Sequence, residues 1–164
     1  MAKTSFNEFL LAVAPEHRVF VEKLNDKLLK QGCELVIKEV KSGYTATYQL
    51  EKKTVMNWVF RKTGIWARIY GDNAGRYEEV IAALPAHMQK KMAASRDCKR
   101  LIDPDSCSDT CVKGFVYSLN GETQKKCRND GMLFLLTEET AEYTAGLTCA
   151  EAAARKPALH QLNR

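Results

Sequence analysis

The first 32 residues have apolar side chains spaced for two amphipathic helices. Ser5 and Glu8 fit a capping box, with an apolar stripe behind it at helical spacing. Pro15 interrupts this short helix and suits the first turn of another, whose apolar spacing continues over residues 16–31. Gly32 follows, where a left-handed residue commonly ends a helix. The pattern predicts a short helix followed by a long one.

From residue 33 to residue 70 the period of the pattern changes to two, which is typical of β-strands. Alternating apolar residues mark four segments, at 35–40, 44–50, 55–60 and 65–70. The connections between them are short, and such connections join antiparallel neighbours. We therefore expect a four-stranded antiparallel meander. One face would pack on helices, and the other would carry Lys53, Arg61 and Arg68.

The second half of the chain mixes helical and strand patterns. A loop at 71–75 precedes a helix that Pro85 ends or kinks, and a further helix runs to about Ser95. Asn120-Gly121 separates two short strand patterns and predicts a hairpin with a type I′ turn.

After this hairpin, residues 132–136 have the composition of a buried strand, and a helix is expected from 137 to about 155, followed by a frayed tail from Pro157. The fold class is thus α+β, in which an antiparallel four-stranded meander packs against helices. We expect one domain over residues 1–164, with a cysteine-rich hairpin module at 98–128 as an integral part of it.

Composition narrows the class of protein. A chain of 164 residues that is 45% hydrophobic and 27% charged suits a single globular domain. It has neither an apolar run of about 18 residues nor a basic start followed by an apolar block, so we expect a cytoplasmic protein without a membrane partner. The net charge of +5 is spread among interspersed acids. Nucleic acid is therefore a possible but not a favoured partner, and a protein or small-molecule ligand stays open.

The cysteines carry the most distinctive chemistry of the sequence. Six are present, and four of them form a candidate metal site within thirty residues: Cys98, Cys107, Cys111 and Cys127. Structural zinc takes four soft ligands in a tetrahedron, often as two pairs. Cys107 and Cys111 are close enough in sequence to form one pair, and the hairpin brings Cys127 back toward Cys111. We expect Cys33 and Cys149 to be ordinary buried residues.

Basic residues flank the clustered cysteines, with Lys99 and Arg100 after Cys98 and with Lys126 and Arg128 around Cys127. Such cations offset the net negative charge of a zinc–thiolate centre, and they also lower the pKa of a free thiol. Three interpretations therefore stay open: a structural zinc site, a disulfide or thiol-redox site, and a set of small buried hydrophobic residues.

Aromatic and basic residues concentrated in the strands form a second candidate site. A ligand surface would use Trp58, Arg61, Trp66, Arg68 and Tyr70. Side chains of this kind stack planar ligands or single-stranded nucleic acid, although they are more often divided between core and solvated face. The sequence has no recognisable catalytic motif, and its three histidines lack partners at ligand or triad spacing.

These observations favour a non-enzymatic, zinc-stabilised binding or adaptor domain. One alternative is a thiol-redox or metal-responsive protein that uses the cysteines. Another is a small-molecule or single-stranded nucleic-acid binder that uses the aromatic face of the sheet.

Two resemblances accompany this interpretation. The order of elements in the first ninety residues resembles a group of small bacterial α+β proteins that includes proposed frataxin-like iron chaperones. The residues that carry this resemblance are 6–16, the long helix to Gly32, the strand 55–60, and Ile69-Tyr70. The whole chain is also similar to a bacterial family of unassigned function that has the cysteine module, through residues 68–73 and 98–101. The first resemblance implies an α+β fold, and neither assigns a functional residue.

Overall fold

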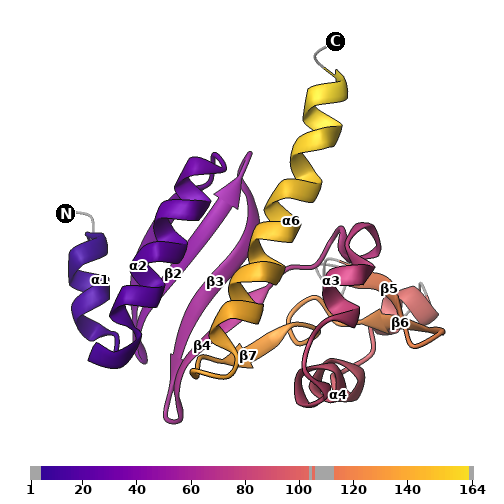
Figure 1. Ribbon diagram of the computed structural model, residues 1–164, viewed down its shortest axis with the longest axis horizontal. Coiled ribbons are helices and arrows are strands. Elements are labelled where there is room, and N and C mark those ends of the chain that lie inside the picture. Colours follow the sequence, from indigo (N-terminus) through magenta and orange to yellow (C-terminus); the bar gives the residue numbers. More distant parts are fainter. Residues whose placement is uncertain (1–4, 104, 106–112, 163–164) are drawn as a thin grey trace.

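The protein is built on one antiparallel sheet with helices on a single face (Figure 1). The computed structural model describes residues 5–103, 105 and 113–162. The sheet has five strands in the order β1-β2-β3-β4-β7: β1 (Glu34–Val40), β2 (Gly43–Leu50), β3 (Lys53–Arg61), β4 (Gly64–Ile69) and β7 (Leu133–Leu135). Neighbouring strands are antiparallel throughout. The meander predicted from the sequence is therefore present as β1–β4.

Three helices cover one face of this sheet: α1 (Phe6–Ala12), α2 (Pro15–Lys30) and α6 (Ala141–Leu162). Figure 1 shows them side by side in front of the strands. Local chemistry sets the limits of the first two. The Ser5 hydroxyl accepts a hydrogen bond from the backbone N–H of Glu8 at 3.2 Å, and Pro15 occupies the first turn of α2. Gly32 has a φ of +97°, which follows the end of α2 as the sequence predicts.

The core lies between the sheet and this helix layer. Trp58 is fully buried at its centre, and its strand neighbours are Ala46 on β2 and Ala67 on β4. Because directly opposite residues of an antiparallel pair project to the same face, these two small side chains leave room for the indole. Tyr48 is also fully buried, and its hydroxyl donates to Asn25 Oδ1 on α2 at 2.8 Å. Burial raises the pKa of Tyr48, so this hydroxyl remains a donor.

The remaining elements lie beside β4 and β7 (Figure 1). They are η1 (Ala74–Arg76), α3 (Glu78–Ala82), α4 (Ala86–Ala94), α5 (Lys99–Ile102), and the hairpin of β5 (Phe115–Leu119) with β6 (Glu122–Lys126). Asn120 and Gly121 have φ values of +53° and +80°. Positive φ at both central residues is the signature of a type I′ turn, so this turn prediction is confirmed.

Three sequence-based expectations need correction. The sheet has a fifth strand, because residues 133–135 return from far along the chain and pair with β4. The helix expected after the 71–75 loop is present but short, as α3, and the 3-10 turn η1 occupies the end of the expected loop. The last helix begins at Ala141 instead of residue 137 and continues to Leu162 instead of ending near 155. Its start is delayed by a turn in which Thr140 Oγ1 donates to the carbonyl of Leu135 at 2.7 Å.

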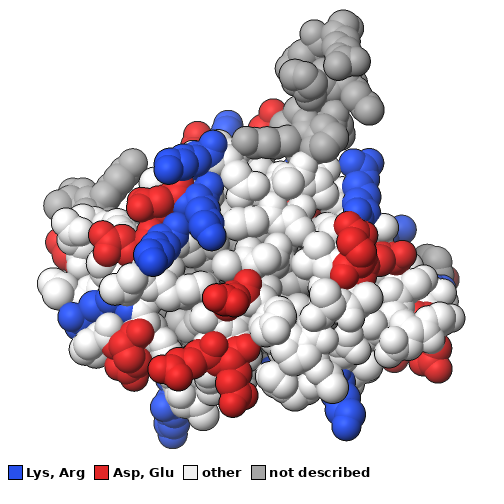
Figure 2. Space-filling model, viewed as in Figure 1, with Lys and Arg blue, Asp and Glu red and all other residues white. Residues whose placement is uncertain are grey.

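Among the described residues, no helix combines the length and the apolar character that a membrane crossing requires. On the face that carries α1, α2 and α6, lysine and arginine side chains are interspersed with aspartate and glutamate around an uncharged central area (Figure 2). The charged residues described on this face therefore do not form the concentrated basic patch that binding to a phosphate backbone uses.

Adjacent leucines on α2 test how the helix is placed. Leu28 is fully buried and Leu29 is 45% exposed. We expect Leu28→Ala to lower the free energy of unfolding by about 2–5 kcal/mol, because it leaves a cavity between helix and sheet. Leu29→Ala is the matched control and should change stability by less than about 0.5 kcal/mol. Urea denaturation followed by circular dichroism measures both, and equal losses would contradict the observed orientation of α2.

Candidate functional site

The fold brings two of the four clustered cysteines together. Cys98 precedes α5 and Cys127 follows β6, and their backbones belong to adjacent extended segments. The N–H of Cys98 donates to the carbonyl of Lys125 at 2.9 Å, and the N–H of Cys127 donates to the carbonyl of Arg96 at 2.8 Å. Cys98 is 5% exposed, and Cys127 is half-buried. Cys98 and Cys127, which are 29 positions apart in the sequence, thus lie on adjacent segments, diagonally across the Asp97–Lys126 bridge.

A buried lysine holds this ladder against α4. Asp97 and Lys126 form an isolated antiparallel bridge between the two cysteines. The side chain of Lys126 is only 4% exposed, and its ammonium group donates to three acceptors. These are the carbonyls of Ala93 and Ser95, at 2.7 and 3.1 Å, and Asp97 Oδ1 at 2.8 Å. An ammonium group has three N–H donors, and all three donors of Lys126 are engaged in these bonds. They fix the position of the segments that carry Cys98 and Cys127.

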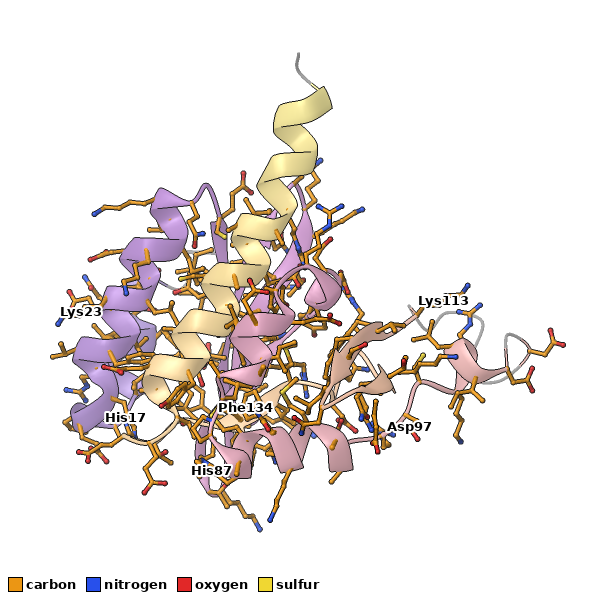
Figure 3. The ribbon with its side chains drawn as sticks, turned by 45° about the vertical axis from the view of Figure 1, so that its right-hand side comes forward. His17, Lys23, His87, Asp97, Lys113 and Phe134 are labelled. Carbon is orange, nitrogen blue, oxygen red and sulfur yellow. The ribbon has the colours of Figure 1, made fainter. Side chains whose placement is uncertain are left out.

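Gly114 brings a backbone donor to the sulfur of Cys98. Its N–H lies 3.2 Å from Cys98 Sγ. A Cβ atom at this position would stand 1.8 Å from the carbonyl oxygen of Lys126, so the close approach requires glycine. A backbone N–H directed at sulfur stabilises negative charge on that sulfur. Figure 3 shows Asp97 and Lys113 at the end of the molecule where this ladder lies.

The other cysteines do not extend this pair within the described chain. Cys107 and Cys111 lie outside the described residues. In residues 5–103, 105 and 113–162, no three side chains of histidine, cysteine, aspartate or glutamate are grouped as metal ligands. Cys33 is buried in the hydrophobic core. Cys149 is half-buried on α6, and burial raises the pKa of its thiol.

The structure divides the predicted aromatic ligand surface between the two faces of the sheet. Trp58 faces the helices and is fully buried. Trp66 and Arg68 alternate with the buried Ala67 on β4, so both project from the face opposite the helix layer. Arg61 is exposed at the end of β3, next to the turn into β4. Trp58 therefore does not share a surface with Trp66.

Cations already contact the indole of Trp66. The guanidinium carbon of Arg61 lies 5.5 Å from the ring centroid, and Lys91 Nζ, from α4, lies 4.8 Å from it. The indole N–H donates to Thr63 Oγ1 at 2.8 Å. Cation–π contacts of this length are attractive, and they orient the indole. A base or other planar ligand would have to displace a cation in order to stack on the occupied ring.

Arg68 and Tyr70 contact the residues that follow Cys127. Arg68 Nε donates to the carbonyl of Asn129 at 2.9 Å, and the guanidinium of Arg128 lies 4.4 Å from the centroid of the Tyr70 ring. Tyr70 is only 9% exposed. Arg128 and Asn129, at the end of the cysteine segment (residues 98–103 and 113–129 of the described chain), thus pack against these two members of the predicted ligand surface. Arg68 and Tyr70 of the predicted ligand surface are therefore in contact with the residues that directly follow Cys127.

A small cavity beside Trp66 was not anticipated from the sequence. It has a volume of about 220 Å³ and lies between α4, β7 and the turn before α6. Its lining comprises Trp66, His87, Met88, Lys91, Phe134, Leu135, Thr137, Glu139 and Thr140. In Figure 3, Phe134 lies near the centre of the molecule, with His87 below it. His87 and Lys91 are four residues apart on α4, a spacing that would have indicated a shared helix face.

A buried carboxylate was also not predicted from the sequence. Glu151 of α6 is fully buried. One oxygen accepts from the backbone N–H of Asn73 (3.0 Å) and the hydroxyl of Tyr77 (2.6 Å), and the other from Asn73 Nδ2 (2.8 Å) and Arg155 Nε (2.9 Å). Burial and then the charge of Glu151 raise the pKa of Tyr77. Because both oxygens are fully occupied, this carboxylate anchors α6 and is not positioned to act as a general base.

Comparison with models of known protein families, with curated proteins and with solved structures gives no match for this chain.

The anchoring role of Glu151 is testable. Glu151→Gln preserves the shape of the side chain but removes its charge and turns an amide N–H toward existing donors. We expect it to lower the free energy of unfolding by about 3 kcal/mol. Glu142→Gln, on an exposed position of the same helix, is the control and should have little effect. Chemical denaturation measures both, and similar small effects would show that the network contributes no net stability.

Proposed function

We propose that the protein is a non-enzymatic binding domain in which zinc holds the cysteine segment against the sheet. Cys98 and Cys127 would supply two thiolate ligands, and the sequence assigns the other two to Cys107 and Cys111, outside the described residues. The single observation that carries this proposal is the adjacency of Cys98 and Cys127 across the backbone ladder. Two ligands delivered by converging segments are a common arrangement in structural zinc sites.

The surroundings of the pair support a metal role over thiol exchange. Cys98 is 5% exposed, and its sulfur accepts a backbone hydrogen bond from Gly114. A thiol that exchanges with partners from solution must be accessible to solvent. Cys98 is almost completely buried. A zinc ligand instead benefits from burial and from N–H donors that orient the sulfur. Burial therefore counts against Cys98 as an exchanging thiol.

The role of the metal would be to stabilise a segment that is poor in core residues. α5 has no buried residue, and Ile102 is 63% exposed. A stretch that buries little apolar surface cannot offset the conformational entropy of ordering it. Metal coordination supplies that free energy in many small modules. By holding Cys127, the metal would also hold Arg128 and Asn129 on Tyr70 and Arg68.

The proposed binding surface is the cavity beside Trp66. Its apolar walls include Phe134 and Met88, and Lys91 provides a cation whose described contact is the indole face. An apolar cavity with a few placed polar groups is the usual form of a small-molecule site. The volume and the lysine suit a small aromatic carboxylate, with its ring against Phe134 and its carboxylate near Lys91.

Metal analysis tests the zinc proposal. We expect one zinc ion per chain by native mass spectrometry for the wild-type protein and for Cys149→Ser. Cys98→Ser and Cys127→Ser should each lose most of the metal. Removing zinc with a chelator should lower the Tm of the wild-type protein by about 5–10 °C, because only the folded state has the assembled site. Metal-free wild-type protein with reactive thiols at all four positions would refute the proposal.

The cavity is tested separately with benzoate as the probe. We expect millimolar benzoate to shift the NMR signal of the Trp66 indole N–H, and benzamide, which lacks the charge, to bind about tenfold more weakly. Lys91→Met, which keeps the aliphatic part of the side chain, should weaken the binding of benzoate by a similar factor. Lys23→Met, at an exposed position on α2 (Figure 3), is the control. Unchanged Trp66 signals, or equal binding of both probes, would contradict this assignment.

A further inference from the structure

Strand β1 ends the sheet with an unpaired edge. It is the terminal strand of the five, and its outer side pairs with no other strand in the described part of the chain. Val36 and Val40 are 37% and 41% exposed on it. Edge strands in soluble proteins are usually shortened, bulged or interrupted to prevent association. β1 instead has seven residues and pairs with β2 in an unbroken register.

We propose that β1 pairs antiparallel with β1 of a second copy, about a two-fold axis at Val36. This register places Glu34 opposite Lys38 of the partner, Leu35 opposite Ile37, and Val36 opposite its own copy. The symmetry repeats each pair, so two Glu–Lys pairs flank a central valine pair. Opposite charges and β-branched residues directly across an antiparallel pair are favourable. Glu34 and Lys38 are both exposed, and no ion pair involves them among the described residues.

The neighbouring registers lack this complementarity. A two-fold axis at Ile37 would place Glu34 opposite Val40 and Lys38 opposite Val36, which leaves each charge facing an apolar side chain. An axis at Lys38 would oppose two lysines, and like charges in direct opposition are destabilising. An axis at Leu35 would place Glu34 opposite Val36. The Val36 register is the one that combines extensive overlap with charge pairing.

Backbone geometry permits this register. In an antiparallel strand, alternate residues direct their N–H and C=O groups to the same side. In β1 the backbone groups of every second residue bond to β2, and the backbone groups of the residues between them face the open edge. Pairing about Val36 places even-numbered residues opposite even-numbered ones and odd opposite odd. The outward N–H and C=O groups of one copy therefore meet the outward groups of the other.

In this register, paired side chains of the two copies also project to the same face of the sheet. Leu35 and Ile37 lie on the helix-covered side, opposite Tyr48 and Ala46 of β2, and both are only half-buried. Val36 lies on the uncovered side. Directly opposite residues share a face, so pairing would cover the half-buried pair on one side and the exposed valines on the other. The two sheets would join into one, with both Trp66 surfaces on its same side.

Sedimentation equilibrium of the full chain over a range of concentrations tests this inference, which depends on neither zinc nor the cavity. The wild-type protein should show a monomer–dimer equilibrium. Lys38→Glu should raise the dimer Kd about tenfold or more, because both charge pairs become repulsive. Glu34→Lys combined with Lys38→Glu restores opposite charges in the reversed order and should return the Kd to near the wild-type value.

Two valine variants provide a matched comparison. Val36→Arg places two cations at the axis and should abolish the dimer, whereas Val116→Arg, at a position 43% exposed on β5, should leave it unchanged. Circular dichroism verifies folding, and the charge-reversal pair decides the question if Val36→Arg does not fold. A monomer at every concentration, a dimer indifferent to Lys38→Glu, or failure of the double variant to recover would overturn the inference.

Discussion

The structure depends on the strict alternation of side chains along β3 and β4. Each successive residue of a strand projects to the opposite face, so the register that buries Trp58 between Ala46 and Ala67 also turns Trp66 and Arg68 outward. A slip of one residue would exchange the two faces completely. The helix layer packs on one side because of this alternation. For the same reason Arg68, which contacts Asn129, belongs to the other side, whereas the cavity is lined from both faces, by Trp66 on one and Phe134 on the other.

Buried polar groups add directional contacts to the apolar packing that joins the second half of the chain to the core. Lys126 fixes the cysteine ladder to the end of α4, and Glu151 fixes α6 to the loop before α3. A buried charge is tolerated only when its hydrogen-bonding capacity is filled. In both cases it is filled, because all three donors of Lys126 and both oxygens of Glu151 have partners. These contacts are directional, so they specify one placement of the segments they join.

The residues that directly follow Cys127 contact the strand side of the molecule. Arg128 and Asn129 directly follow Cys127 and contact Tyr70 and Arg68 on the strand side. A change in the cysteine segment, such as metal loss, would therefore be felt at the sheet through these contacts. This coupling gives the proposed metal a role beyond local folding, because it would keep the surface beside the Trp66 cavity in one arrangement.

Much of the fold was predictable because local signals were consistent. The Ser5 cap, the position of Pro15 at a helix start and the Asn120-Gly121 turn each depend on interactions within a few residues, and the structure has all three. The pairing of β7 with β4 was not predictable, since a three-residue strand has too short a pattern to indicate its partner. The sequence raised a division of the aromatic residues between core and solvated face but could not place Trp58 and Trp66 relative to each other, because they belong to different strands, whose relative register only pairing decides.

The sequence by itself determined the α+β class, the four-stranded meander, and the presence of clustered cysteines amid basic residues. Those properties follow from periodicity, turn chemistry and composition, which act over short stretches of chain. Tertiary structure alone decided that Cys98 and Cys127 are neighbours, that Lys126 and Glu151 are buried, and that Lys91 reaches the indole of Trp66. Each of these depends on contacts between segments far apart in the chain, and the free energy of such contacts appears only when the whole core assembles.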